Sequence, residues 1–247
     1  MLIHQTKEKL AEMKLSGMLS GLQEQLEHDG YDEMSFEERV GLLVDKEYLL
    51  RENRRLTRRF REARLKAQIE DVDFRAPRGL DRELYLYLAG GSWITQRHNV
   101  IMTGPTGCGK TYLACALAHK ACRDGFRCIY YHFPDLLREL SISRAEGTDH
   151  LFLRKLGRRD LIIIDDWLWE PVTAEQARAI VELFENRFRS RSTLLTSQIP
   201  VSEWHDRFQD PTLADAVLDR IVHDSYRVEL SGDSMRKRTA NLTKRNS

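Results

Sequence analysis

The spacing of apolar side chains divides the chain into a helical first part and a mixed second part. Residues 1–70 contain no proline, and their apolar positions recur every three or four residues, as on one face of a helix. From residue 100 onward, short continuous apolar runs of strand length alternate with longer helical patterns. Such runs are typical of strands buried on both faces of a parallel sheet. We therefore expect an all-helical module followed by an α/β domain with a parallel sheet between helices.

The helical module is expected to contain two segments. The apolar face of the first covers residues 10–26, and we expect breaks near Gly17 and Gly21. Ser35 and Glu38 have the spacing of a capping box, in which each residue bonds the backbone N–H of the other. A second, long helix should therefore begin at this point and continue into the arginine-rich segment that follows.

Turn residues and apolar runs set the expected boundaries of the second part. Residues 71–79 carry a proline and a glycine and show little periodicity, so they are expected to link residues 1–70 to a second domain over 80–247. The expected strands are 100–103, 128–132, 161–166, 193–198 and 226–230. Helices are expected at 80–88, 110–122, 136–140, 148–156, 173–190, 204–208 and 213–223, with a basic helix after residue 234.

Composition adds charge blocks and an expected compartment. The formal net charge is only +1, yet residues 1–50 carry 5 Lys or Arg against 11 Asp or Glu, while residues 51–66 carry 8 against 2. Blocks of this kind favour surfaces built for particular partners. The 4 cysteines form no C-x-x-C pair, and no signal peptide or apolar run of about 20 residues is present. We expect a soluble cytoplasmic protein that makes no membrane contact.

The stretch from Gly104 to Thr111 reads G-x-x-x-x-G-K-T between an expected strand and an expected helix, which is the P-loop pattern. Its glycines let backbone N–H groups face phosphate oxygens, and the following helix directs its positive end at them. Lys110 would reach the β- and γ-phosphates of ATP, and Thr111 would offer its hydroxyl to Mg²⁺. A glycine-rich turn without a ligand is the alternative, and the strand–loop–helix context argues against it. The expected nucleotide-binding residues are Gly104, Pro105, Thr106, Gly107, Cys108, Gly109, Lys110, Thr111 and Tyr112.

A second motif follows the apolar run 161–164. Asp165 and Asp166 end this run as adjacent carboxylates, at the strand end that opens onto the ligand crevice of an α/β sheet. We expect Asp165 to hold Mg²⁺, mostly through water, and Asp166 to act as the general base on the attacking water. Gln198 ends the next strand, where it could orient that water or touch the γ-phosphate. The alternative is a strand that simply ends in a polar turn.

The basic segment after residue 50 has two interpretations. It could be a solvated helix face, or it could contact the phosphate backbone of DNA. Arginines outnumber lysines there, and guanidinium groups suit phosphate oxygens. No aromatic residues that would indicate base reading are interleaved, so affinity should be largely independent of sequence. The candidate DNA contacts are Arg51, Arg54, Arg55, Arg58 and Arg59.

Taken together, these motifs resemble the AAA+ ATPases of the initiator and helicase-loader branch over about residues 97–237. Within that branch, three features are similar to the IstB-type helper ATPases of insertion sequences. They are the N-terminal module, with M-K-L-S-G-M-L near residue 13, the strand tip T-S-Q-I-P at 196–200, and the ending G-D-S-M-R-K from residue 232. The resemblance implies that Gln198 is sensor 1, Arg220 the arginine finger and Arg236 the sensor 2 residue. One position departs from the family pattern, because Leu168 follows Trp167 where the family tends to have glycine.

This resemblance also implies a function. The chain is expected to be an ATPase that uses ATP and Mg²⁺, binds and remodels duplex DNA, and helps a partner transposase engage its target. Nucleotides would lie between the subunits of a homo-oligomer. The open alternatives are a DnaC-like replicative helicase loader, a small-molecule phosphotransferase, and a DNA-binding scaffold with an inactive nucleotide site. For Arg220, the alternative to a finger is a local ion pair with Asp219 or Asp224.

Overall fold

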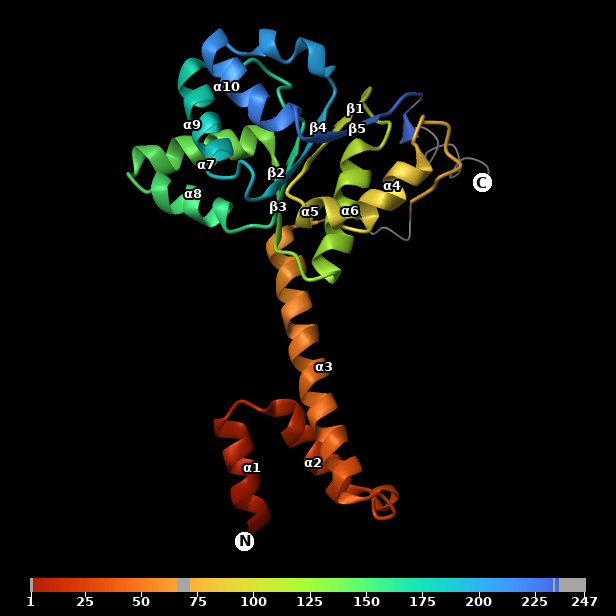
Figure 1. The fold of residues 1–247 in the computed structure, drawn as a ribbon. Coiled ribbons are helices and arrows are strands. Elements are labelled where there is room, and N and C mark those ends of the chain that lie inside the picture. Colours follow the sequence, from red (N-terminus) through yellow and green to blue (C-terminus); the bar gives the residue numbers. More distant parts are fainter. Residues whose placement is uncertain (1, 66–71, 233, 236–247) are drawn as a thin grey trace, which may run out of the picture. The chain divides into compact units, whose positions relative to one another are not determined.

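The computed structural model describes residues 2–65, 72–232 and 234–235, and the chain forms two compact units, Met1–Arg58 and Arg59–Ser247 (Figure 1). The first unit contains α1 (Leu2–Glu12), α2 (Ser16–Glu27), a 3₁₀ turn (Asp29–Tyr31) and most of α3 (Phe36–Ala63). The last turns of α3 belong to the second unit. Among the described helices, none combines the length and hydrophobicity that a bilayer crossing requires.

The expected capping box forms at the start of α3. The Ser35 N–H donates to Glu38 Oε2 at 2.8 Å, and the Glu38 N–H donates to Ser35 Oγ at 3.2 Å. These two bonds satisfy N–H groups that have no partner within the helix. The sequence pattern therefore predicted the beginning of the longest helix correctly.

The expected breaks at Gly17 and Gly21 are wrong, because both glycines lie inside α2. The chain turns instead at Lys14, whose φ is +57°. A Cβ atom at Gly17 would lie 2.5 Å from the Cα atom of Glu47 in α3, and one at Gly21 would lie 2.8 Å from the Leu43 side chain. The glycines therefore serve close packing between two helices, a role that helical propensity alone does not indicate.

The second unit is built on a five-stranded parallel sheet in the order β2-β3-β4-β1-β5. Helices cover both of its faces (Figure 1), which confirms the expected α/β class. The strands are β1 (Asn99–Thr103), β2 (Cys128–His132), β3 (Leu161–Asp165), β4 (Ser192–Ser197) and β5 (Ser225–Glu229). The helices are α4 (Arg82–Ala89), α5 (Ser92–Thr95), α6 (Lys110–Arg123), α7 (Phe133–Ala145), α8 (Asp149–Gly157), α9 (Ala174–Glu185) and α10 (Pro211–Val222).

Alternate residues of the strands pack into two different hydrophobic cores. Val100 and Met102 of β1 pack into the core that contains α4, α5 and α6. Ile101 points to the opposite face, into the core that contains α7, α8, α9 and α10. Because successive side chains of a strand point to opposite faces, a sheet covered on both sides needs apolar residues at every position. This requirement explains the continuous apolar runs of the sequence.

Two segments differ from their expected structure. The helix expected at 173–190 ends at Glu185, and the chain then coils so that the Arg187 guanidinium reaches the carbonyls of Leu156 and Arg159 at 2.8 and 3.0 Å. The helix expected at 204–208 is instead two 3₁₀ turns, Val201–Glu203 and His205–Arg207. This segment lies between Pro200 and Asp210, the N-cap of α10.

Strand order places the expected site at one edge of the sheet. The strands β3, β4 and β1 are neighbours, with Thr103 beside Ser197 at their carboxyl ends. The P-loop follows β1, the acidic pair ends β3, and Gln198 follows β4. Because the strands are parallel, their carboxyl ends meet at the same edge, which is where ligands bind in open α/β sheets.

Candidate nucleotide-binding site

The P-loop is a backbone cradle that only glycine can form here. Gly104, Gly107 and Gly109 have φ values of +148°, +84° and +100°, which L-residues rarely adopt. A Cβ atom on Gly104 would also collide with the carbonyl oxygen of Leu230, and one on Gly107 with the Ser234 side chain. Helix α6 begins directly after the loop, at Lys110. The loop therefore presents backbone N–H groups and the positive end of a 14-residue helix to the same point, as a phosphate site requires.

Lys110 lies folded over this loop. Lys110 is only 5% exposed, and its ammonium donates hydrogen bonds to the carbonyl oxygens of Gly104 at 2.7 Å and Pro105 at 3.0 Å. Burial lowers the pKa of the Lys110 ammonium, and the neighbouring Cys108, Asp166 and Asp165 act against that shift. These carbonyls are weaker partners for a cation than phosphate oxygens, because a carbonyl offers only a dipole whereas a phosphate oxygen carries negative charge. The ammonium is thus held where it can exchange the carbonyls for an anion.

Asp165 is the centre of a hydroxyl cluster. Its Oδ1 accepts hydrogen bonds from Thr111 Oγ1 at 2.9 Å and from Thr196 Oγ1, and its Oδ2 accepts one from Tyr130 at 2.7 Å. Burial and this bond to Asp165 raise the pKa of Tyr130 well above its ordinary value, so the phenol remains a donor.

Thr111 and Asp165 offer the kind of oxygen donors that Mg²⁺ prefers. The Thr111 hydroxyl and the Asp165 carboxylate oxygen lie 2.9 Å apart, joined by a hydrogen bond. Asp165 is only 3% exposed, which leaves its carboxylate little contact with bulk water. The two residues expected to hold the ion therefore lie side by side.

Asp166 faces the loop rather than the cluster. Its backbone has a left-handed φ of +55°. Gln198 Nε2 donates to Asp166 Oδ1 at 3.0 Å, and Thr106 of the P-loop donates to the Gln198 amide oxygen. His132 Nε2 lies 3.3 Å from Asp166 Oδ2. Hydrogen bonds therefore link the P-loop through Gln198 to Asp166 along this edge of the sheet.

The departure at Leu168 has a structural counterpart. Leu168 has a φ of +55°, so its backbone adopts the left-handed conformation that favours glycine, although its side chain is fully buried. The loop after the acidic pair therefore has the backbone conformation that a glycine would adopt at this position. Because the residue is leucine, this left-handed conformation costs energy.

Several predicted residues lie elsewhere. Arg220 lies near the end of α10, at the amino edge of the sheet, and pairs with Glu185 rather than with Asp219 or Asp224 as the alternative had it. Arg236 and the expected terminal helix fall outside the described residues. Of the five candidate DNA contacts on α3, two make ion pairs along the helix, Arg51 with Glu47 and Arg55 with Glu52, both at 2.6 Å. Arg54 and Arg58 are exposed and Arg59 is half-buried.

Three residues of the site were not expected from the sequence. Tyr130 and His132 reach it because β2 lies beside β3, with His132 paired to Asp165 in register. No local sequence motif encodes the order of strands in a sheet. Only the alternation of Tyr130 and His132 along one strand could have indicated that both face the site. Arg78 is 3% exposed beside Gly109, and its Nε has no hydrogen-bond partner among the described residues. A cation buried in this way lies within reach of an anion on the loop.

Sequence comparisons find relatives over nearly the whole chain. Residues 8–243 match the family described as IstB-like ATP binding protein. The chain is 44% identical over 239 residues to the insertion sequence ATP-binding protein y4pL of Sinorhizobium fredii, covering 96% of this chain and 98% of that protein. It is 30% identical over 249 residues to the ATP-binding protein of insertion sequence IS21 of Pseudomonas aeruginosa, covering 99% and 94%.

Solved structures show the same fold at low sequence identity. DnaI matches with a TM-score of 0.57 and 21% identity, over 67% of this chain and 91% of that one. The DnaA of Aquifex aeolicus, bound to AMPPCP, matches with a TM-score of 0.57 and 18% identity, over 73% of this chain and 55% of that one. The second unit therefore has the AAA+ fold found in DnaA and its relatives. Since the family match covers most of both units, the chain belongs to the family of IstB-like ATP-binding proteins.

Proposed function

We propose that the chain hydrolyses ATP with Mg²⁺ and, as an oligomer on duplex DNA, helps the transposase of an insertion sequence engage its target. One observation carries the ATPase part. A second carboxylate, Asp166, is linked to the P-loop through Gln198 and does not share the hydroxyl donors that bond to Asp165. Separate carboxylates allow one to hold the ion and the other to act on water.

Each residue then has a distinct role. Lys110 would bind the β- and γ-phosphates, and Thr111 with Asp165 would hold Mg²⁺, which supplies positive charge to the phosphate oxygens when bound. Asp166 would accept the proton of the attacking water at its carboxylate. The Gln198 amide donates a hydrogen bond to the Asp166 carboxylate in this structure. With ATP bound, Gln198 would orient both that carboxylate and the attacking water.

The position of Arg220 supports an oligomer. Asn99 starts β1 and its side-chain amide donates to the Arg220 carbonyl at 3.4 Å, whereas the P-loop follows Thr103 at the other end of this strand. A strand rises about 3.3 Å per residue, so the two ends are roughly 13 Å apart. The guanidinium of Arg220 also lies on Glu185. Arg220 is thus poorly placed for its own nucleotide and better placed for that of a neighbouring subunit.

The partners follow from the relatives and from charge. Relatives that align over nearly the whole chain are named for insertion sequences, which favours transposition over replicative helicase loading. The arginines of α3 are the proposed contacts to the DNA backbone, and the acidic first 50 residues are the proposed surface for the transposase. ATP hydrolysis measured with and without DNA, while the particle is sized, tests the proposal. A chain that binds ATP yet neither hydrolyses it nor assembles would contradict it.

Lys110→Ala should weaken nucleotide binding about 10- to 150-fold. Hydrogen bonds to charged groups contribute about 1.5–3 kcal/mol each, and Lys110 supplies the one side-chain charge of the P-loop. Titration with a fluorescent ATP analogue measures the effect. Lys120→Ala is the matched control, because Lys120 lies on the same helix but pairs with Asp124 on the surface. Equal affinities of the two variants would exclude Lys110 from the site.

Replacing Arg54, Arg55 and Arg58 with serine should flatten the salt dependence of DNA binding. Each phosphate neutralised contributes about −0.9 to the slope of log affinity against log salt, so the slope should become shallower by up to about 2.7. Binding should weaken for all DNA sequences alike. A triple variant of exposed arginines on α7 and α8, Arg138, Arg144 and Arg154, serves as the control. An unchanged slope would mean that α3 presents a solvated face or a protein-binding surface.

A further inference from the structure

Arg78 is a buried arginine beside the P-loop, and most of its hydrogen-bond donors are unused. It is only 3% exposed, and its Nη2 donates to the Asp73 carbonyl at 2.8 Å. Its Nε is buried and has no hydrogen-bond partner among the described residues. A guanidinium carries five N–H donors, and burying it without acceptors is unfavourable. An added acceptor beside Arg78 would therefore stabilise the protein.

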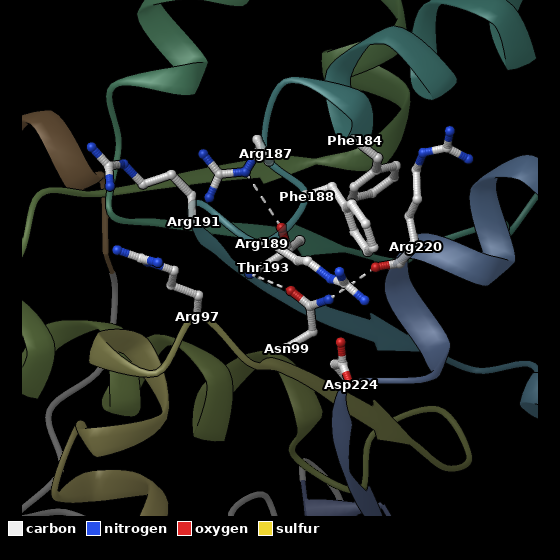
Figure 2. Close-up of a pocket in the computed structure, with 10 residues that line it drawn as sticks. All are labelled: Arg97, Asn99, Phe184, Arg187, Phe188, Arg189, Arg191, Thr193, Arg220 and Asp224. Carbon is white, nitrogen blue, oxygen red and sulfur yellow. Dashed lines mark hydrogen bonds between the residues drawn. The ribbon is translucent and has the colours of Figure 1, made fainter.

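A second buried arginine shows how this chain satisfies a guanidinium that serves packing. Arg187 is 2% exposed, and all three of its side-chain nitrogens have acceptors (Figure 2). Its Nε donates to Thr193 Oγ1 at 3.4 Å, its Nη1 to the Leu156 carbonyl at 2.8 Å, and its Nη2 to the Ser192 carbonyl. Only one of the three nitrogens of Arg78 has an acceptor among the described residues. The two buried arginines therefore differ in a way that burial alone does not explain.

The backbone around Arg78 holds its side chain against the last glycine of the P-loop. The Arg78 carbonyl accepts from the Ser231 N–H at 2.9 Å, and the Arg78 N–H donates to the Ala76 carbonyl at 2.8 Å. A Cβ atom at Gly109 would lie 2.7 Å from Arg78 Nη1. Because Gly109 is the N-cap of α6, the guanidinium lies at the beginning of that helix.

This position is electrostatically unfavourable unless an anion is bound. The amino end of the 14-residue helix α6 carries partial positive charge, and Lys110 is its first residue. Asp165 and Asp166 favour the charge of Lys110, whereas Arg78 forms no ion pair with a residue that the structure describes. Like charges at one point repel each other, and a phosphate group on the loop would attract all of them. Arg78 and the beginning of α6 together therefore have the properties of an anion site.

We propose that Arg78 binds the α-phosphate, the one next to the ribose, of the nucleotide held by the P-loop of its own chain. The inference rests on the proposed nucleotide site and extends it. Lys110 lies on the carbonyls of Gly104 and Pro105, at the beginning of the loop, and is the proposed contact for the β- and γ-phosphates. Arg78 lies at the other end of the loop, beside Gly109, so the α-phosphate is the group left for it to bind. The planar guanidinium suits the two free oxygens of that phosphate.

The test compares Arg78→Met, Arg78→Lys and Arg75→Met as full chains. Methionine keeps the apolar stem of the side chain but removes the charge and the donors. Arg78→Met should weaken binding of fluorescent ATP and ADP analogues about tenfold or more, and by the same factor, because both nucleotides carry the α-phosphate. Arg78→Lys should have a smaller effect, since it keeps the charge. Arg75 is exposed in the same segment, so Arg75→Met is the matched control and should bind both nucleotides normally.

Thermal unfolding separates a ligand contact from a structural role. Removing a buried charge that lacks acceptors should keep or raise the unfolding temperature of the nucleotide-free chain in Arg78→Met. The rise in unfolding temperature caused by a fixed concentration of ADP should be smaller than in the unchanged chain. Arg187→Met should behave in the opposite way. It leaves buried carbonyls without donors, so it should lower the unfolding temperature while nucleotide affinity stays the same.

Each contrary result has its own meaning. If Arg78→Met is unstable without nucleotide or does not fold, Arg78 is a structural residue like Arg187 and the inference is wrong. If Arg78→Met weakens the binding of ATP but not of ADP, Arg78 contacts the γ-phosphate and the assignment is overturned. If Arg78→Met binds like Arg75→Met while Lys110→Ala binds weakly, the proposed function stands without Arg78. If Lys110→Ala also binds normally, the nucleotide site itself is wrong, and the proposed function fails with it.

Discussion

Arg220→Ala should lower ATP hydrolysis by roughly 10³–10⁵-fold while the chain stays folded and binds ATP. An arginine supplied to a phosphoryl-transfer site stabilises charge that develops only in the transition state, and contributions of this size follow. The ion pair with Glu185 cannot account for such an effect, because pairs this exposed contribute about 1 kcal/mol or less to stability. The measurements are phosphate release, nucleotide affinity and thermal unfolding of the same preparation.

Glu185→Ala provides the matched control for Arg220. It breaks the same ion pair but leaves the guanidinium in place, so hydrolysis should be retained or increased. Loss of activity in both variants alike would assign Arg220 a structural role within its own subunit. Mixing Arg220→Ala with Asp166→Asn chain should restore part of the activity, since some interfaces then combine an intact Arg220 with an intact Asp166. Co-assembly without any restored activity would contradict action between subunits.

Asp166→Asn should bind ATP normally and hydrolyse it about 10²–10⁴-fold more slowly. General-base catalysis contributes on this scale, and the amide keeps the shape and the oxygen that accepts from Gln198 Nε2. Binding of the fluorescent analogue should survive while single-turnover phosphate release falls.

Asp165→Asn is the informative comparison for this prediction. Asp165 accepts three hydroxyl hydrogen bonds and is the proposed ligand of Mg²⁺, so its amide variant should make hydrolysis depend on higher magnesium concentrations. If Asp166→Asn shows that magnesium dependence instead, the two carboxylates have exchanged roles. If it loses ATP binding altogether, Asp166 is a structural part of the loop.

The sequence predicts those site residues that belong to a continuous motif next to a strand or a helix. The P-loop glycines, Lys110 and Asp165 occupy consecutive stretches whose strand and helix contexts were visible as apolar patterns. Residues brought by neighbouring strands were not predictable in this way. Tyr130 and His132 depend on β2 lying beside β3, and parallel strands carry no local mark of their order.

The structural role of a glycine is difficult to predict from the sequence. Gly17 and Gly21 suggested helix breaks, yet they lie within α2 where Glu47 and Leu43 approach closely. A break and a close helix contact use the same residue, and helical spacing does not distinguish them. The converse holds at Arg97, Arg189 and Leu168, which adopt left-handed backbone without being glycine. Side-chain type gave no sign of that conformation.

The packing around the P-loop has a consequence for reading the evolution of this family. Gly104 lies against Leu230, Gly107 against Ser234, and Gly109 against the guanidinium of Arg78. The Leu230 carbonyl and the positive φ values of the three glycines demand residues without side chains whether or not ATP is ever bound. A descendant that had lost nucleotide binding would still be selected to keep all three glycines, simply to fold. Retained glycines are therefore weak markers of ATP use among relatives, whereas loss of Lys110 or of Asp166 would reveal a degenerate ATPase.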